Sequence, residues 1–171
     1  MANKPVEIVE LAGNAGVYKA NLGTSNFLVR SFMAGLFIAV GAALCTVCGT
    51  GVEKTLGPGF KALVGGAVFP VGLIAIVLTG MSLFTGDTML IPMAVFQKKT
   101  TWDKVFNAWF WVYIGNFVGS IFWAYLMVVG PLTKGGGPEL TVFGQNAVAI
   151  AEAKTLPYIA TGTLGLWSAF M

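Results

Sequence analysis

Residues 82–88 read Ser-Leu-Phe-Thr-Gly-Asp-Thr and interrupt an otherwise apolar run. Residues 69–78 before them read Phe-Pro-Val-Gly-Leu-Ile-Ala-Ile-Val-Leu, and residues 89–96 after them read Met-Leu-Ile-Pro-Met-Ala-Val-Phe. Each flank is long enough to form about half of a membrane helix. A polar, glycine-containing interruption at that depth is tolerated only where protein or a water-filled cavity surrounds it. The pattern therefore predicts a membrane helix over residues 61–97 that is broken near residues 80–88.

Such a break predicts a binding site for an anion. The second half-helix begins with unpaired backbone N–H groups and the positive end of the helix dipole, which transporters turn toward their substrates. The hydroxyl of Thr85 is the candidate donor to a carboxylate, although it can instead satisfy a carbonyl freed by the break. Asp87 would repel an anion, so we expect it to cap the second half-helix, to be protonated or to lie in a wider vestibule. Its position favours the cap.

The composition indicates an all-α, polytopic membrane protein. Of the 171 residues, 56% are hydrophobic and only 10% are charged, and the mean hydropathy is +0.80. Soluble domains contain about 25% charged residues. The net charge of +3 is scattered along the chain, which argues against nucleic acid as a partner. No signal peptide is expected, because Lys4, Glu7 and Glu10 interrupt the start.

We expect neither a cofactor nor a metal. The absence of histidine removes bis-histidine haem ligation, most zinc sites and histidine acid–base catalysis, so an enzyme is not expected. Cys45 and Cys48 occur as Cys-Thr-Val-Cys, which can be read as a redox or metal pair. Because no further ligands accompany them, we interpret both as packing residues.

The hydrophobic pattern divides the chain into an amphipathic N-terminal segment, residues 1–26, and a membrane domain, residues 27–171. A short helix is expected within the first segment. Membrane helices are expected at about residues 27–49, at 61–97 with its break, and at 102–129. A long external connection is expected to follow, and a fourth helix to start from residue 158.

Small residues predict close contacts between these helices. They recur at every fourth position in the first membrane helix, and a Gly-xxx-Gly pair lies in the third. The residues concerned are Ser31, Gly35, Ala39 and Ala43 in the first and Gly115 and Gly119 in the third. Asn116, between the two glycines, is a membrane-embedded amide that needs a partner.

Basic residues favour a cytoplasmic N-terminus. Those on the side of the N-terminus are Lys4, Lys19, Arg30, Lys98, Lys99 and Lys104, and those on the opposite side are Lys54, Lys61, Lys134 and Lys154.

Three motifs resemble the formate/nitrite transporter family. One is residues 83–88, preceded by Leu-Val-Gly-Gly at residues 63–66. The others are Ala-Gly-Val-Tyr-Lys-Ala at residues 15–20 and Tyr-Ile-Gly-Asn-Phe-Val-Gly at residues 113–119. Together they extend from residue 15 to residue 119. Two positions depart from the family pattern, since Ser82 stands where the family is often acidic and Asp87 where it often has Asn.

The resemblance implies passage of a small monovalent anion, with formate first, through a pore in each protomer of a homopentamer in the plasma membrane. It also implies an aquaporin-like bundle of two inverted three-helix halves. The sequence carries the first half and part of a fourth helix. We therefore expect a fragment, or a chain that does not transport by itself.

The resemblance also implies site residues. Phe69, Leu73 and Leu83 correspond to apolar constrictions beside an anion site at Thr85, and Phe84 is counted with the pore residues. Lys154 corresponds to a lysine that draws anions into the outer vestibule. Without the resemblance, the apolar residues would be interpreted as packing and Lys154 as a solvated loop lysine.

Several alternatives stay open. No motif separates formate from nitrite, hydrosulfide, acetate or lactate. A non-transporting membrane anchor of a formate-oxidising enzyme would carry cofactor ligands or a docking surface, and a water or polyol channel would carry Asn-Pro-Ala boxes. The sequence shows none of these features.

Overall fold

The computed structural model describes residues 3–170, so residues 1, 2 and 171 of the two expected segments lie outside it. The described chain is helical, with one isolated bridge between Thr133 and Leu140. Its elements are α1 (Pro5–Ala20), α2 (Thr24–Cys48), α3 (Val52–Leu56), α4 (Pro58–Val68), α5 (Pro70–Thr79), α6 (Phe84–Phe96), α7 (Trp102–Met127), the π-helical turn η1 (Val128–Leu132), α8 (Val142–Ala160) and α9 (Gly162–Phe170).

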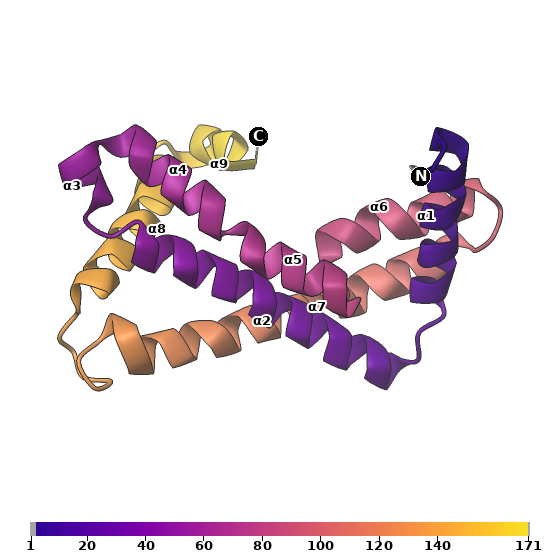
Figure 1. The fold of residues 1–171 in the computed structure, drawn as a ribbon, viewed down its shortest axis with the longest axis horizontal. Helices are drawn as coiled ribbons and strands as arrows, with labels where there is room; N and C mark the ends of the chain where they lie inside the picture. The colour runs from indigo at the N-terminus through magenta and orange to yellow at the C-terminus, as the bar shows by residue number, and fades with distance from the viewer. Residues whose placement is uncertain (1–2, 171) are drawn as a thin grey trace. The chain divides into compact units, whose positions relative to one another are not determined.

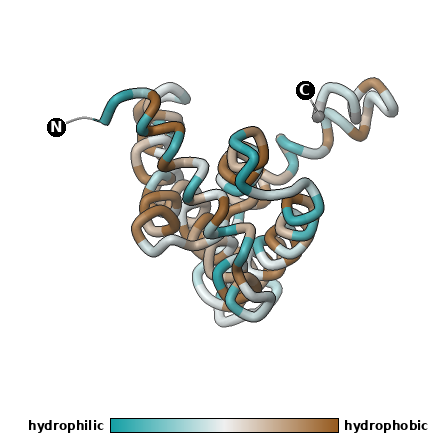
Figure 2. The backbone as a smooth tube through the Cα atoms, turned by 90° about the vertical axis from the view of Figure 1, so that its right-hand side faces the viewer, coloured by the Kyte–Doolittle hydropathy of each residue, from teal (hydrophilic) through white to brown (hydrophobic). Residues whose placement is uncertain are grey.

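Three helical stretches of the described chain are long and apolar enough to cross a membrane. They are Thr24–Cys48, Pro58–Thr79 (α4 and α5 together) and Trp102–Leu132, whereas α6 is shorter. Large apolar side chains are exposed along these helices, such as Leu78 at 81%. Figure 2 shows such apolar residues, in brown, recurring along the helical segments. An exterior this apolar suits lipid rather than water.

The chain forms two compact units (Figure 1). The first contains the chain up to residue 42 and residues 69–124, and the second contains residues 43–68 and the chain from residue 125. In the first unit α1 packs against α6. The core of this unit is a buried cluster of Phe27, Ile91, Val105, Ala108 and Val112. It joins the start of α2 to α6 and α7.

Glycines set the helix contacts in the first unit, as the small-residue spacing predicts. A Cβ atom added at Gly35 of α2 would overlap the backbone carbonyl of Asn116 in α7, and one added at Gly115 would overlap the Ser31 side chain. Likewise, Gly41 of α2 faces the carbonyl of Phe69. Close backbone approach replaces the hydrophobic driving force that helices lack in lipid.

The fourth apolar helix starts earlier than the sequence pattern suggested. The expected connection ran to residue 157, but α8 already begins at Val142. The chain turns through Gly135 and Gly136, both with positive φ, and the Thr141 side chain then accepts a hydrogen bond from the Gly144 N–H (3.2 Å). This N-cap and the alanine-rich residues 147–153 explain the helix.

Candidate functional site

The break between α5 and α6 is short. Gly80 adopts the left-handed conformation (φ 68°, ψ 26°) that ends α5, and the Met81 N–H donates back to the Ile76 carbonyl (3.0 Å). Leu83 is extended (φ −99°, ψ 135°), and α6 begins at Phe84. Residues 84–88 are therefore helical, although the expected break reached residue 88. The Phe84 ring packs edge-on against the Tyr113 ring, which holds the start of α6 on α7.

Side chains from three other helices satisfy the carbonyl groups that the break exposes. The Gly80 carbonyl accepts from the Arg30 guanidinium on α2 (3.0 Å). The Met81 carbonyl accepts from the Lys19 ammonium on α1 (3.3 Å). The Ser82 carbonyl accepts from the Asn116 amide on α7 (3.0 Å). Since unpaired backbone groups are costly in hydrocarbon, these bonds allow the interruption to exist at membrane depth.

Asn116 connects both ends of the break. Its Nδ2 donates to the carbonyls of Ser31 (2.8 Å) and Ser82, and its Oδ1 accepts from the Phe84 N–H (2.9 Å). The amide that the sequence marked as needing a partner thus has three.

Asp87 does not cap α6, so that prediction is wrong. The N-cap residue is Leu83, and Asp87 lies one turn inside the helix. Its side chain is fully buried, with Oδ1 2.5 Å from the Lys19 Nζ, and the Lys19 side chain is itself only 14% exposed. The same ammonium lies 3.4 Å from the Ser82 Oγ. Lys19 therefore offsets the charge of Asp87.

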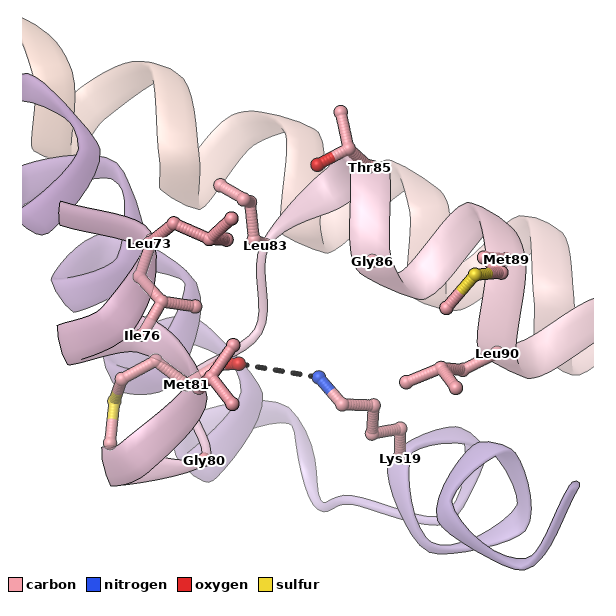
Figure 3. A pocket seen from close by; sticks show the side chains of 11 residues that line it. Lys19, Leu73, Ile76, Gly80, Met81, Leu83, Thr85, Gly86, Met89 and Leu90 are labelled. Atoms are coloured by element: carbon pink, nitrogen blue, oxygen red, sulfur yellow. Dashed lines mark hydrogen bonds between the residues drawn. The ribbon is translucent and has the colours of Figure 1, made fainter. Parts of the chain in front are cut away.

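A cavity of about 420 Å³, the break pocket, lies beside this cluster. Its walls are mostly apolar and come from the end of α5 and the start of α6, including Leu73, Leu83, Thr85 and Gly86. Figure 3 shows Lys19 reaching from α1 into the space between these two helix ends.

Within residues 3–170, the backbone N–H groups of Thr85 and Gly86 make no hydrogen bond and border the break pocket as free donors. Their neighbours are not free, because the Phe84 N–H is bonded to Asn116 and the Asp87 N–H to the Leu83 carbonyl (2.9 Å). Two N–H donors at the positive end of a helix dipole are suited to an anion, while the Lys19 ammonium beside them is paired with Asp87.

Comparison with known proteins identifies the family. The profile of the formate/nitrite transporter family matches residues 6–171. The chain belongs to this family. Among similar proteins, formate channel BtFdhC of Bacillus thuringiensis is 40% identical over 89% of this chain and 56% of its own length. Formate channel FocA of Escherichia coli K12 is 36% identical over 88% of this chain and 51% of its own length.

A solved structure of an FNT family ion channel superposes with a TM-score of 0.72 at 27% identity, over 90% of this chain and 60% of that one. The chain is therefore an all-helical membrane protein of a family of channels and transporters, which are not enzymes. It spans about half the length of the relatives that it matches.

The structure brings together some of the residues that the formate/nitrite transporter motifs indicated. Thr85, Leu83 and Leu73 line the break pocket. Phe84 instead packs toward α7, and Phe69 lies just before α5 with 40% of its surface exposed. Lys154 lies on α8, in the second unit.

Lys19 is the site residue that the sequence interpretation missed. It was treated only as part of a family motif and as a basic residue near the N-terminus. The sequence contained only a weak signal, because no acidic residue lies three or four positions from Lys19 to pair with it locally. Asp87 is a carboxylate inside an apolar stretch, so it needed a positively charged partner.

Proposed function

We propose that the chain forms part of a membrane pore that passes a small monovalent anion, with formate as the preferred substrate. The observation that carries this proposal is the pair of N–H donors of Thr85 and Gly86, which border the break pocket beside Lys19. The names of the relatives support formate, because the Bacillus thuringiensis and Escherichia coli proteins are formate channels.

The chemistry of formate matches the donors available. Its two oxygens can each accept a hydrogen bond, one from a backbone N–H and one from the Thr85 hydroxyl or the other N–H. The walls from Leu73 and Leu83 are apolar and offer no hydrogen bonds that would compete with these. Nitrite presents a similar pair of oxygens, and the volume of the pocket also admits acetate or lactate.

The remaining expectations belong to the same proposal. The excess of basic residues supports a cytoplasmic N-terminus in the plasma membrane. The family resemblance supports a homopentamer in which α4, α5 and α6 form one broken helix of an aquaporin-like bundle. Phe69 would then contribute to a constriction, and Lys154 would attract anions to the outer mouth of the pore.

Replacing Thr85 by Val tests the site. We expect the full-length protein carrying this change to assemble normally but to pass labelled formate into liposomes more slowly. Loss of one donor costs about 1–3 kcal/mol, or roughly a five- to 150-fold loss of flux. Thr85→Ser keeps the hydroxyl and should retain most of the flux.

The matched control is Thr79→Val. The Thr79 hydroxyl donates to the Ala75 carbonyl (2.5 Å) within α5, and Thr79 does not line the break pocket. Its flux should equal that of the unchanged protein. Undiminished flux in Thr85→Val would refute the assignment of Thr85. If the unchanged full-length protein passed no formate, formate would be wrong as the substrate. If it also passed no nitrite, hydrosulfide, acetate or lactate, the anchor alternative would replace the pore.

A further inference from the structure

We propose that Asn116 is a positioning residue for anion binding, because its amide prevents α6 from extending backward through the break. This inference rests on the proposed function. In a continuous helix each N–H donates to the carbonyl four residues earlier. The N–H groups of Thr85 and Gly86 would then pair with the carbonyls of Met81 and Ser82 and be lost as donors to a ligand.

Side chains occupy the groups needed for each of these helical bonds. Extending α6 backward by one turn requires the bonds from residues 84, 85 and 86 to the carbonyls of residues 80, 81 and 82, and none of these three is made. Arg30 donates to the first of these carbonyls, Lys19 to the second and Asn116 to the third. Asn116 also accepts from the N–H of Phe84, so it blocks two of the three bonds. The regular ladder resumes with the N–H of Asp87 bonded to Leu83 (2.9 Å).

An amide is suited to this task because it donates and accepts at once. Nδ2 and Oδ1 of Asn116 lie on the same rigid plane, so the Ser82 carbonyl and the Phe84 N–H are held in a fixed relation. A carboxylate accepts but does not donate, and an aliphatic side chain does neither. Either replacement would release the Ser82 carbonyl to the Gly86 N–H.

The position of Asn116 is itself fixed by packing against α2. Its backbone carbonyl lies against Gly35, where no Cβ atom would fit. The second Nδ2 proton is directed at the Ser31 carbonyl (2.8 Å), and Ser31 is fully buried. Because contacts with α2 fix the Asn116 amide, its bonds to Ser82 and Phe84 keep these two residues in their non-helical arrangement.

The test compares Asn116→Leu with Ser120→Ala. Ser120 lies one turn along α7 and also bonds to α2, through the Gly35 carbonyl (3.1 Å), but it does not touch the break. Labelled protein in micelles would be followed residue by residue by NMR. The measurements are amide exchange, 13Cα shifts and the response of the Thr85 and Gly86 amides to sodium formate.

In Asn116→Leu we expect the 13Cα shifts of Met81 and Ser82 to move toward helical values. Amide exchange at Gly86 should slow by about tenfold relative to Val112 in the core of the same variant, because the amide gains a helical partner. The formate concentration at which the Thr85 and Gly86 amides are half-saturated should rise about tenfold, as expected from the loss of one hydrogen bond to the anion. Ser120→Ala should change none of these.

Slower amide exchange at Gly86 distinguishes a positioning role of Asn116 from a general role in stability. If Asn116→Leu only loosened the packing, the Gly86 amide would exchange faster. Unchanged or faster exchange relative to Val112, with non-helical shifts, would overturn the role of Asn116 even if affinity fell. If Asn116→Leu does not fold, Asn116→Ala makes the same test without added volume. A wild-type protein whose Thr85 and Gly86 amides ignore formate would instead overturn the proposed function.

Discussion

Replacing Asp87 by Leu is expected to lower the free energy of unfolding by about 3–5 kcal/mol, because it leaves a buried ammonium without its counter-charge. Asp87 is fully buried, and its Oδ1 lies 2.5 Å from the Nζ of Lys19. Asp87→Asn should be nearly as harmful, since an amide accepts a hydrogen bond but carries no charge. A helix cap would have predicted the opposite, because Asn caps a helix as well as Asp does.

Removing both charges supplies the control. Replacing both partners of a buried ion pair by apolar residues is often neutral, so Lys19→Met with Asp87→Leu should recover most of the stability. Denaturant titration followed by circular dichroism measures the unchanged protein, the single variants Lys19→Met and Asp87→Leu, and the double variant. If the losses of the two single variants simply add in the double variant, the two side chains do not stabilise each other as proposed. Formate binding should nevertheless stay weaker than in the unchanged protein. The Met81 carbonyl loses its bond from Lys19 and becomes free to accept from the Thr85 N–H.

Replacing Gly35 by Leu is expected to separate α2 from α7. A Cβ atom at this position would overlap the carbonyl oxygen and carbonyl carbon of Asn116, and backbone atoms cannot rotate away as a side chain can. We expect a loss of about 3 kcal/mol or more, at or above the upper end of ordinary overpacking. The displaced Asn116 would also release the break, so formate binding should fall with stability.

Gly66→Leu is the matched control for this change. Gly66 lies in α4, and a Cβ atom added there meets no atom within 4 Å. The two variants add the same apolar volume to a membrane helix, so only the packing differs. In detergent, Gly35→Leu alone should change the elution volume in size-exclusion chromatography and lower the midpoint temperature of thermal unfolding. Equal behaviour of the two variants would contradict the close contact between α2 and α7.

The sequence by itself determined the properties that depend on neighbours along the chain. Long apolar runs identify membrane helices because spanning a bilayer requires only length and hydrophobicity. The polar residues 82–88 placed the interruption correctly at its start but extended it too far, since α6 begins at Phe84. The spacing of Ser31 and Gly35 indicated a contact surface, because helical periodicity places such residues on one face. Thr85 could be named as a candidate anion-binding residue because the first N–H groups of any helix lack partners within the helix.

Only the tertiary structure decided which groups from distant parts of the chain meet at the break. Lys19 and Asp87 lie 68 positions apart, and Asn116 and Ser82 lie 34 apart. No local pattern encodes these pairings, because they depend on how α1, α6 and α7 pack around the core. Asp87 could therefore be recognised as needing a partner, yet its assignment as a cap failed. A buried charge is neutralised by whichever opposite charge the packing brings within reach, and here that is the ammonium of Lys19.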